Sequence, residues 1–251
     1  MSAPNPHPLV AAFDGLLALR PYAAANPSDV AAQFAAFCGA NLMRSRAQLF
    51  QDLFVVLFLR GKRNGFFVEF GATNGTDLSN TLLLEREFQW NGILAEPARC
   101  WHLALKTSRR AAIDTRCIWS ETGATLEFKE TELQDLSTLS SLVDRDFNRG
   151  GRLKGTFYAV ETISLNDLLK VHNSPREIDY LSIDTEGSEL AILQAFDFSP
   201  YDIKIITVEH NFCEPDRQEI NLLLTGRGFV RLFEPFSKFD DWYIKKSILG
   251  L

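Results

Sequence analysis

The stretch FFVEFGATNG, residues 66–75, decides the fold of this chain. Its first five residues are apolar except for Glu69, as expected of a buried strand that carries one carboxylate. Gly71 and Gly75 follow at once, and glycine permits a sharp turn and a close approach to a ligand. The stretch therefore predicts a strand that ends in a glycine loop, at the edge where open parallel sheets bind ligands.

Short apolar strands alternate with amphipathic helices after this stretch. Four later segments have the length and character of strands: GILAEP (92–97), AIDTRCIWS (112–120), IDYLSID (178–184) and IKIITVEH (203–210). The segments FVRLFE (229–234) and DWYIKK (241–246) predict an antiparallel terminal hairpin. This alternation indicates an α/β fold with a mostly parallel sheet that is covered on both faces.

Helical patterns occupy the first 60 residues, before the strands begin. We therefore expect an N-terminal helical extension over residues 1–60 that packs on the core, and a main domain over residues 61–251. One long stretch, residues 131–155, is polar and has no period, which predicts a lid or an excursion near the substrate.

Composition limits the partners of the chain. Its formal net charge is −6 and it has no long basic run, so nucleic acid is not an expected partner. Its apolar run at residues 49–62 is too short to cross a bilayer and contains Asp52, and no signal peptide is recognisable. The four cysteines are scattered, as in a reducing compartment. We expect a cytoplasmic protein without a membrane span.

The glycine loop favours a cationic ligand. Its spacing, Gly71-Ala-Thr-Asn-Gly75, breaks the G-x-G-x-x-G pattern of dinucleotide sites, which weakens the interpretation as a nicotinamide-dependent oxidoreductase. A carboxylate before such a loop suits S-adenosylmethionine, which carries an ammonium and a sulfonium group. The alternative is a capped turn in which Glu69 bonds nearby backbone amides. Glu96 ends the next strand, where an acidic side chain binds ribose hydroxyls in both kinds of nucleoside cofactor, or simply begins a surface helix.

Two motifs together resemble a known family. GFFVEFGATNGTDLSNTLLLEREFQWNGILAEP (65–97) and IDYLSIDTEGSELAILQAF (178–196) are similar to the FkbM family of S-adenosylmethionine-dependent methyltransferases. The resemblance extends over about residues 48–245. It implies a class I methyltransferase fold, Rossmann-like, with a seven-stranded sheet whose last strand is antiparallel. It also implies O-methylation of hydroxyls on sugars, glycolipids or polyketide-type metabolites.

The resemblance also implies a cofactor site built from the glycine loop and the strand ends. Carried over residue by residue, this site consists of Glu69, Gly71, Ala72, Thr73, Asn74, Gly75, Ser79, Asn80, Glu96, Cys117 and Ile118. The loop would hold the methionine end, the segment 79–80 would close over it, and Glu96 would bind the ribose. Residues 117–118 would flank the adenine.

Polar residues at two later strand ends are the catalytic candidates. Asp184 ends one strand, and Glu209 with His210 ends another, so the three can meet beside the transferred methyl group. His210 would be the general base with a carboxylate to orient it, or the three would hold Mg²⁺ or Mn²⁺. The alternative is that these groups only cap strands and helices.

The sequence thus predicts an O-methyltransferase that uses S-adenosylmethionine and acts on a free hydroxyl of a sugar-containing or other small-molecule acceptor. The alternative is a non-catalytic interaction protein that retains the fold. The intact glycine loop, Glu96 and the Asp184–Glu209 pair favour the enzyme.

Overall fold

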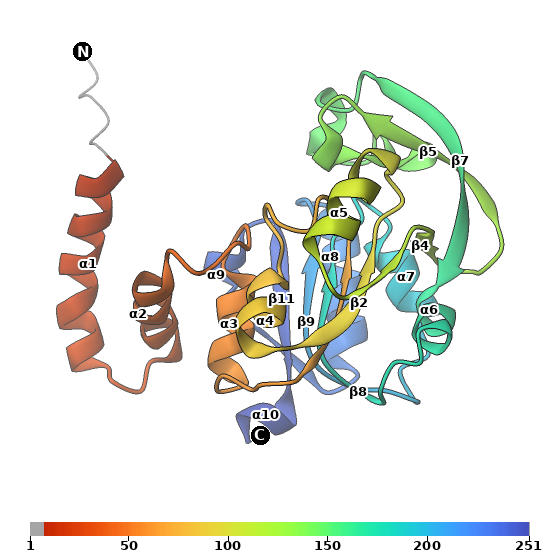
Figure 1. Cartoon of the computed structure of the whole chain (residues 1–251). Coiled ribbons are helices and arrows are strands. Elements are labelled where there is room, and N and C mark those ends of the chain that lie inside the picture. The colour runs from red at the N-terminus through yellow and green to blue at the C-terminus, as the bar shows by residue number, and fades with distance from the viewer. Residues whose placement is uncertain (1–7, 251) are drawn as a thin grey trace, which may run out of the picture. The chain divides into compact units, whose positions relative to one another are not determined.

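The computed structural model describes residues 8–250, and its chain divides into two compact units, Met1–Ser45 and Arg46–Leu251 (Figure 1). The first unit contains α1 (Pro8–Ala25) and α2 (Val30–Asn41). The helix α3 (Gln51–Phe58) belongs to the second unit, so the division lies before the expected boundary at residue 60. Packing of an N-terminal extension on the core stays a prediction.

A seven-stranded sheet forms the centre of the second unit. Its order is β10-β11-β9-β8-β1-β2-β3, where β11 is antiparallel to both of its neighbours. The strands are β1 (Phe66–Phe70), β2 (Asn91–Ala95), β3 (Ala112–Asp114), β8 (Glu177–Ile183), β9 (Asp202–Glu209), β10 (Phe229–Leu232) and β11 (Asp240–Lys245). The antiparallel last strand confirms the terminal hairpin and the class I methyltransferase fold.

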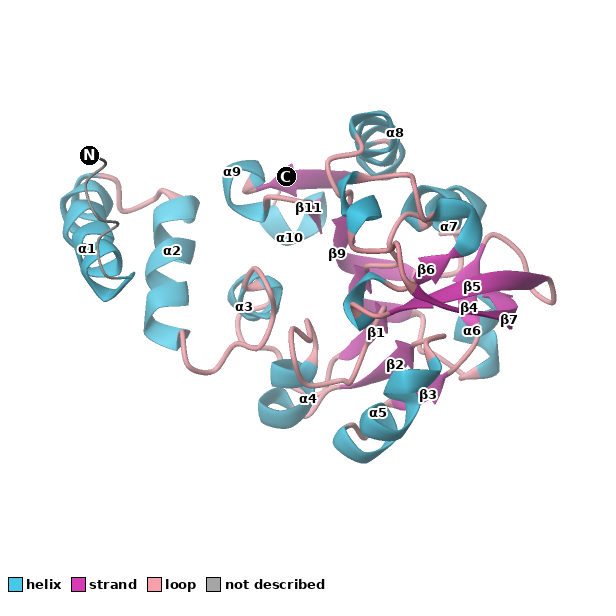
Figure 2. Ribbon diagram, turned by 90° about the horizontal axis from the view of Figure 1, so that it is seen from above, coloured by secondary structure: helices cyan, strands magenta, loops and turns pink. Residues whose placement is uncertain are grey.

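Helices cover both faces of this sheet, as Figure 2 shows. On one side lie α3, α4 (Leu82–Phe88) and α5 (His102–Ser108); on the other lie α6 (Leu165–Val171), α7 (Glu189–Ala195) and α8 (Glu214–Thr225). The short helices α9 (Glu234–Ser237) and α10 (Lys246–Leu249) flank β11. Val68, Leu181 and Ile206 are buried in the core between these layers, which explains why the strand sequences are almost continuously apolar.

A second, four-stranded sheet was not expected from the sequence. Its order is β4-β7-β5-β6, and it comprises β4 (Cys117–Trp119), β5 (Thr125–Thr131), β6 (Thr138–Leu139) and β7 (Gly155–Ser164). The segment 112–120, expected as one strand, is divided: β3 pairs with β2, whereas β4 pairs with β7. We call residues 117–164 the insertion.

Short 3-10 turns occupy much of the polar stretch 131–155, namely η2 (Gln134–Leu136), η3 (Ser140–Leu142) and η4 (Phe147–Gly150). Such turns and the two-residue strand β6 have no long sequence period, which is why periodicity could not detect them. Across residues 8–250, no helix combines the length and the apolar character needed to cross a membrane.

Candidate active site

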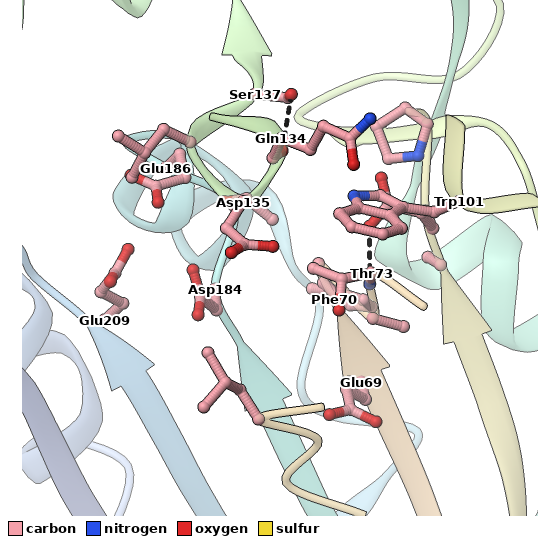
Figure 3. Close-up of a pocket in the computed structure, with 18 of the residues that line it drawn as sticks. Glu69, Phe70, Thr73, Trp101, Gln134, Asp135, Ser137, Asp184, Glu186 and Glu209 are labelled. Atoms are coloured by element: carbon pink, nitrogen blue, oxygen red, sulfur yellow. Dashed lines mark hydrogen bonds between the residues drawn. The ribbon is translucent and has the colours of Figure 1, made fainter. Parts of the chain in front are cut away.

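A cavity of about 560 Å³ opens at the carboxyl ends of β1, β2, β8 and β9 (Figure 3). The parallel register of these strands brings their last residues to one edge, which is where ligands bind in open α/β sheets. Gln134, Asp135 and Ser137 of the insertion line the cavity as well, opposite the strand ends. The cavity therefore has a floor from the sheet and a cover from the insertion.

The glycine loop turns directly after β1. Gly71 has a φ of 68°, and a Cβ placed on it would lie 1.9 Å from the backbone oxygen of Asp184. Gly75 has a φ of 77°, and its Cβ would lie 2.6 Å from Leu105 on α5. Both positions therefore require glycine, because the chain adopts a left-handed conformation in close contact with a neighbouring element. At Gly71 this contact lets β1 and β8 end side by side under the cavity.

The partners of Glu69 are protein groups. Its carboxylate accepts hydrogen bonds from the backbone N–H of Asn80 at 2.8 Å and from Thr81 Oγ1 at 2.5 Å. Ser79 Oγ lies 3.3 Å away, and the Nη1 atom of Arg109 lies 3.6 Å away. Arg109 is fully buried and was not singled out from the sequence. Although Glu69 lines the cavity, it also ties the end of β1 to the start of α4 and to the end of α5.

Glu96 holds the second strand end in a similar way. Its two carboxylate oxygens each accept a backbone N–H at 2.8 Å, one from Thr73 in the glycine loop and one from Ala98. The side chain is buried, and burial raises the pKa of this carboxyl to about 7 in spite of these two hydrogen bonds. Glu96 therefore joins the loop after β1 to the loop after β2 and faces the cavity.

Asn80 presents an unsatisfied acceptor to the cavity. Its Nδ2 atom donates to Ser182 Oγ on β8 at 2.9 Å, whereas its Oδ1 atom is buried without a hydrogen-bond partner. Buried polar atoms are normally paired, so this oxygen indicates that a ligand with an N–H or O–H donor belongs here.

Most of the expected cofactor residues line the one cavity, namely Glu69, Gly71, Ala72, Thr73, Ser79, Asn80, Glu96, Cys117 and Ile118. Two do not: Gly75 packs against α5, and the side chain of Asn74 bonds Thr76 and Asp77 within its own turn. Cys117 and Ile118 reach the cavity from β4 in the insertion, not from the end of a third central strand as expected.

Three carboxylates gather at the far end of the cavity, on Asp184, Glu186 and Glu209, and we call them the acidic cluster. One oxygen from each lies within 4.8 Å of the others, and Figure 3 shows the three side chains above the ends of β8 and β9. Burial and the like charges of their neighbours raise the pKa of each carboxyl. For Glu186 the raised pKa is about 7, although the charge of Arg152 acts to lower it. The cluster therefore concentrates three carboxyl groups whose ionised forms are disfavoured by burial and by one another.

His210 lies outside the cavity. His210 follows the end of β9 and does not line this cavity; it lines a much smaller pocket beside it, together with Glu209. Its Nδ1 atom accepts the backbone N–H of Phe212 at 3.1 Å, and its Nε2 atom lies 3.9 Å from Asp241 Oδ1. Burial lowers the pKa of the imidazole. Glu186, which was not among the catalytic candidates, joins Asp184 and Glu209 in the cluster instead of His210.

The insertion supplies site residues that the sequence did not reveal. Asp135 points into the cavity from η2 toward Asp184, and the indole of Trp101 lies beside Thr73 (Figure 3). Arg152 is buried and forms an ion pair with Glu186. The only signal for Asp135 and Arg152 was the polar character of the stretch 131–155, which indicates no contact partner for either of them. Trp101 lies outside the insertion, directly before α5, and had no such signal.

Comparison with a family model supports the identification of the motifs. The family model for the methyltransferase FkbM domain matches residues 69–231, from β1 to β10. No curated protein sequence matches the chain. Among solved structures, the fibrillarin/Nop5p complex is similar with a TM-score of 0.38 and 13% identity, over 80% of this chain and 81% of that chain. An O-methyltransferase from Bacillus cereus in complex with SAH is similar with a TM-score of 0.39 and 12% identity, over 90% of this chain and 95% of that chain. Because this family model matches most of the second unit, the chain belongs to the FkbM family of S-adenosylmethionine-dependent methyltransferases.

Proposed function

We propose that the protein transfers a methyl group from S-adenosylmethionine to a hydroxyl oxygen of a sugar-containing or other small-molecule acceptor. One observation carries the proposal: the glycine loop, Glu96 and the acidic cluster line a single cavity. A chain that had become a non-catalytic interaction protein would have no need to keep mutually repelling carboxylates buried beside an intact cofactor loop.

The residues of the cavity fit the cofactor. The Oδ1 atom of Asn80 lacks a donor, which the ammonium group of the methionine end would supply. Glu96 offers its remaining lone pairs to the ribose hydroxyls, and Cys117 with Ile118 offers an apolar surface to the adenine. Trp101 adds an aromatic face on the same side.

The cofactor supplies an electrophilic methyl group on a sulfonium ion, and the chain supplies the base. An acceptor hydroxyl held at the acidic cluster would be aligned with this methyl group, so that its oxygen would take the methyl as the carbon–sulfur bond breaks and the electrons of that bond stay on sulfur. The hydroxyl proton passes to the Asp184–Glu209 pair. Burial and the repulsion between the two carboxylates raise the pKa of both, so an ionised member of this pair is a strong proton acceptor.

A divalent ion is the second candidate for activating the hydroxyl. The close approach of the carboxylate oxygens favours it, because Mg²⁺ and Mn²⁺ prefer oxygen ligands. The expected set of Asp184, Glu209 and His210 does not fit, since His210 lies outside the cavity. Asp184 and Glu209 would hold such an ion and would fix and acidify the hydroxyl. Arg152 already ion-pairs Glu186, which disfavours a second cation at that carboxylate.

The proposal is tested with S-adenosylmethionine carrying a tritiated methyl group and fractions of hydroxyl-bearing small molecules. We expect a labelled product that resists mild alkali, as a methyl ether does and a methyl ester does not. Transfer should survive exhaustive chelation and should be lost in the Asp184→Asn variant. Loss on chelation with recovery in Mg²⁺ or Mn²⁺ would establish the metal instead. Tight cofactor binding without any labelled product would favour the interaction protein.

A further inference from the structure

Arg152 connects separate parts of the molecule through a buried guanidinium. Its side chain is fully buried, and its Nε atom donates to the backbone oxygen of Leu136 at 3.0 Å. Two N–H groups donate to the carboxylate of Asp146 at 2.9 Å each, and Nη2 also donates to Glu186 Oε2. Such a forked geometry is the strong, directional form of an arginine–carboxylate pair. One side chain thus joins η2, the approach to η4 and the loop after β8.

The contacts of Glu186 show that this junction is built from both sides. Its backbone oxygen accepts Thr138 Oγ1 at 2.9 Å, and its Oε2 atom accepts Asn148 Nδ2 at 3.4 Å, both from the insertion. Asn211 Nδ2 reaches the same Oε2 atom at 3.1 Å and donates to Glu209 at 2.6 Å. The backbone of Glu186 has a φ of 58°, a value that residues other than glycine seldom adopt. The turn is therefore held in place by the insertion docked upon it.

Charge gives the junction a second consequence. Glu186 belongs to the acidic cluster, and Arg152 supplies a full positive charge in contact with it. A buried carboxylate that loses its cation is strongly unfavourable, more so beside two others. The insertion residues 134–137 follow β5 and cover the cavity. They are held by Arg152 through its hydrogen bond to the backbone oxygen of Leu136.

We propose that Arg152 is a positioning residue that couples closure of the insertion over the cavity to the charge of the acidic cluster. The inference rests on the proposed function, because the group covered is taken to be S-adenosylmethionine with its sulfonium beside that cluster. Removal of Arg152 should both loosen the cover and make the cavity more negative. Removal of the Glu186 charge should loosen the cover but make the cavity less negative.

The test compares S-adenosylmethionine, which carries the sulfonium charge, with neutral-sulfur S-adenosylhomocysteine. Both are titrated by calorimetry into the full-length wild type and four variants, Arg152→Gln, Arg152→Lys, Glu186→Gln and Arg149→Gln. Arg149 is an exposed arginine of the same segment and serves as the matched control. Hydrogen exchange of residues 132–152 reports the cover independently.

We expect Arg152→Gln to bind both ligands at least about 10-fold more weakly and to expose residues 132–152 to exchange. Its preference for the cationic ligand should rise by about 3-fold or more, whereas Glu186→Gln should lower that preference. Arg152→Lys should restore the preference, and Arg149→Gln should match the wild type. A purely structural role would weaken both ligands alike.

The inference is overturned if Arg152→Gln behaves like Arg149→Gln, or if Arg152→Gln and Glu186→Gln shift the preference in the same direction. Should Arg152→Gln fail to fold, Glu186→Gln alone tests the inference. The inference then requires both a lowered preference for the cationic ligand and faster hydrogen exchange of residues 132–152 in Glu186→Gln. Wild-type protein that binds neither ligand would refute the proposed function, whereas wild-type binding with unresponsive variants would refute only this inference.

Discussion

The two ends of the cavity treat their carboxylates in opposite ways. At the end with the glycine loop, Glu69 is surrounded by N–H and O–H donors with Arg109 nearby, and Glu96 accepts two backbone amides. At the end with the acidic cluster, Asp184 and Glu209 lie close to each other, and the nearby cation Arg152 is paired with Glu186 and Asp146. The Glu69 carboxylate thus ties structural elements together through its donors, whereas the ionised forms of Asp184 and Glu209 are disfavoured by burial and by each other.

This contrast indicates which carboxylates stabilise the fold and which lower its stability. A carboxylate with several donors adds to the free energy of unfolding, and its loss leaves those donors unpaired. A carboxylate beside others lowers that free energy, and its neutralisation relieves repulsion. Removal of the carboxylate should therefore change the free energy of unfolding in opposite directions at Glu69 and at Asp184.

The largest effect is expected at Glu69. The Glu69→Ala variant leaves the Thr81 hydroxyl, the Asn80 amide and part of the Arg109 charge unpaired in the interior. We expect the free energy of unfolding to fall by about 4 kcal/mol in urea denaturation. Glu121→Ala, at an exposed position, should leave it unchanged. An equal, small change in both variants would remove Glu69 from the stabilising set.

The pH dependence of stability should carry the signature of Glu96. Its pKa is raised from 4.5 to about 7, so the folded state holds this proton more tightly than the unfolded chain does. Its contribution is therefore complete below pH 4.5 and is lost as the pH rises through about 7. Between pH 5 and pH 8 the free energy of unfolding of the wild type should fall by about 2.5 kcal/mol more than that of Glu96→Gln. Parallel pH profiles of the two proteins would contradict this.

The affinity for S-adenosylhomocysteine should also depend on Glu96. Removal of the Glu96 carboxylate takes away the acceptor that we assign to the ribose hydroxyls. We expect Glu96→Ala to weaken S-adenosylhomocysteine by about 2 kcal/mol, the scale of a hydrogen bond to a charged group. Isothermal titration measures the difference, and an unchanged affinity would exclude Glu96 from the cofactor site.

The smallest effect, and the one of opposite sign, is expected at Asp184. The Asp184→Asn variant removes one of the mutually repelling charges while it keeps the shape of the side chain. We expect the free energy of unfolding to rise by about 1.5 kcal/mol although methyl transfer is lost. Destabilisation by this variant would show that the Asp184 carboxylate is a structural partner and not part of a charged site.

The sequence predicted the sheet, the glycine loop and the carboxylates at the strand ends, because those elements follow local patterns. Gly71 illustrates the limit of such prediction: its spacing indicated a turn, but only the structure shows the Asp184 backbone that excludes a Cβ. Arg109 and Arg152 could not be predicted, since each pairs with a carboxylate far away in the sequence. His210 was misplaced because whether the residue after a strand continues its alternation or turns into the site depends on the loop that follows.

The central claim is that the cavity at the strand ends is a site for S-adenosylmethionine and not for a dinucleotide. Calorimetric titration of the wild-type protein with S-adenosylhomocysteine and, separately, with NAD tests it most directly. We predict saturable one-to-one binding of S-adenosylhomocysteine, weakened in Glu96→Ala, and no binding of NAD at the same concentrations. Tight binding of NAD without binding of S-adenosylhomocysteine would contradict the account.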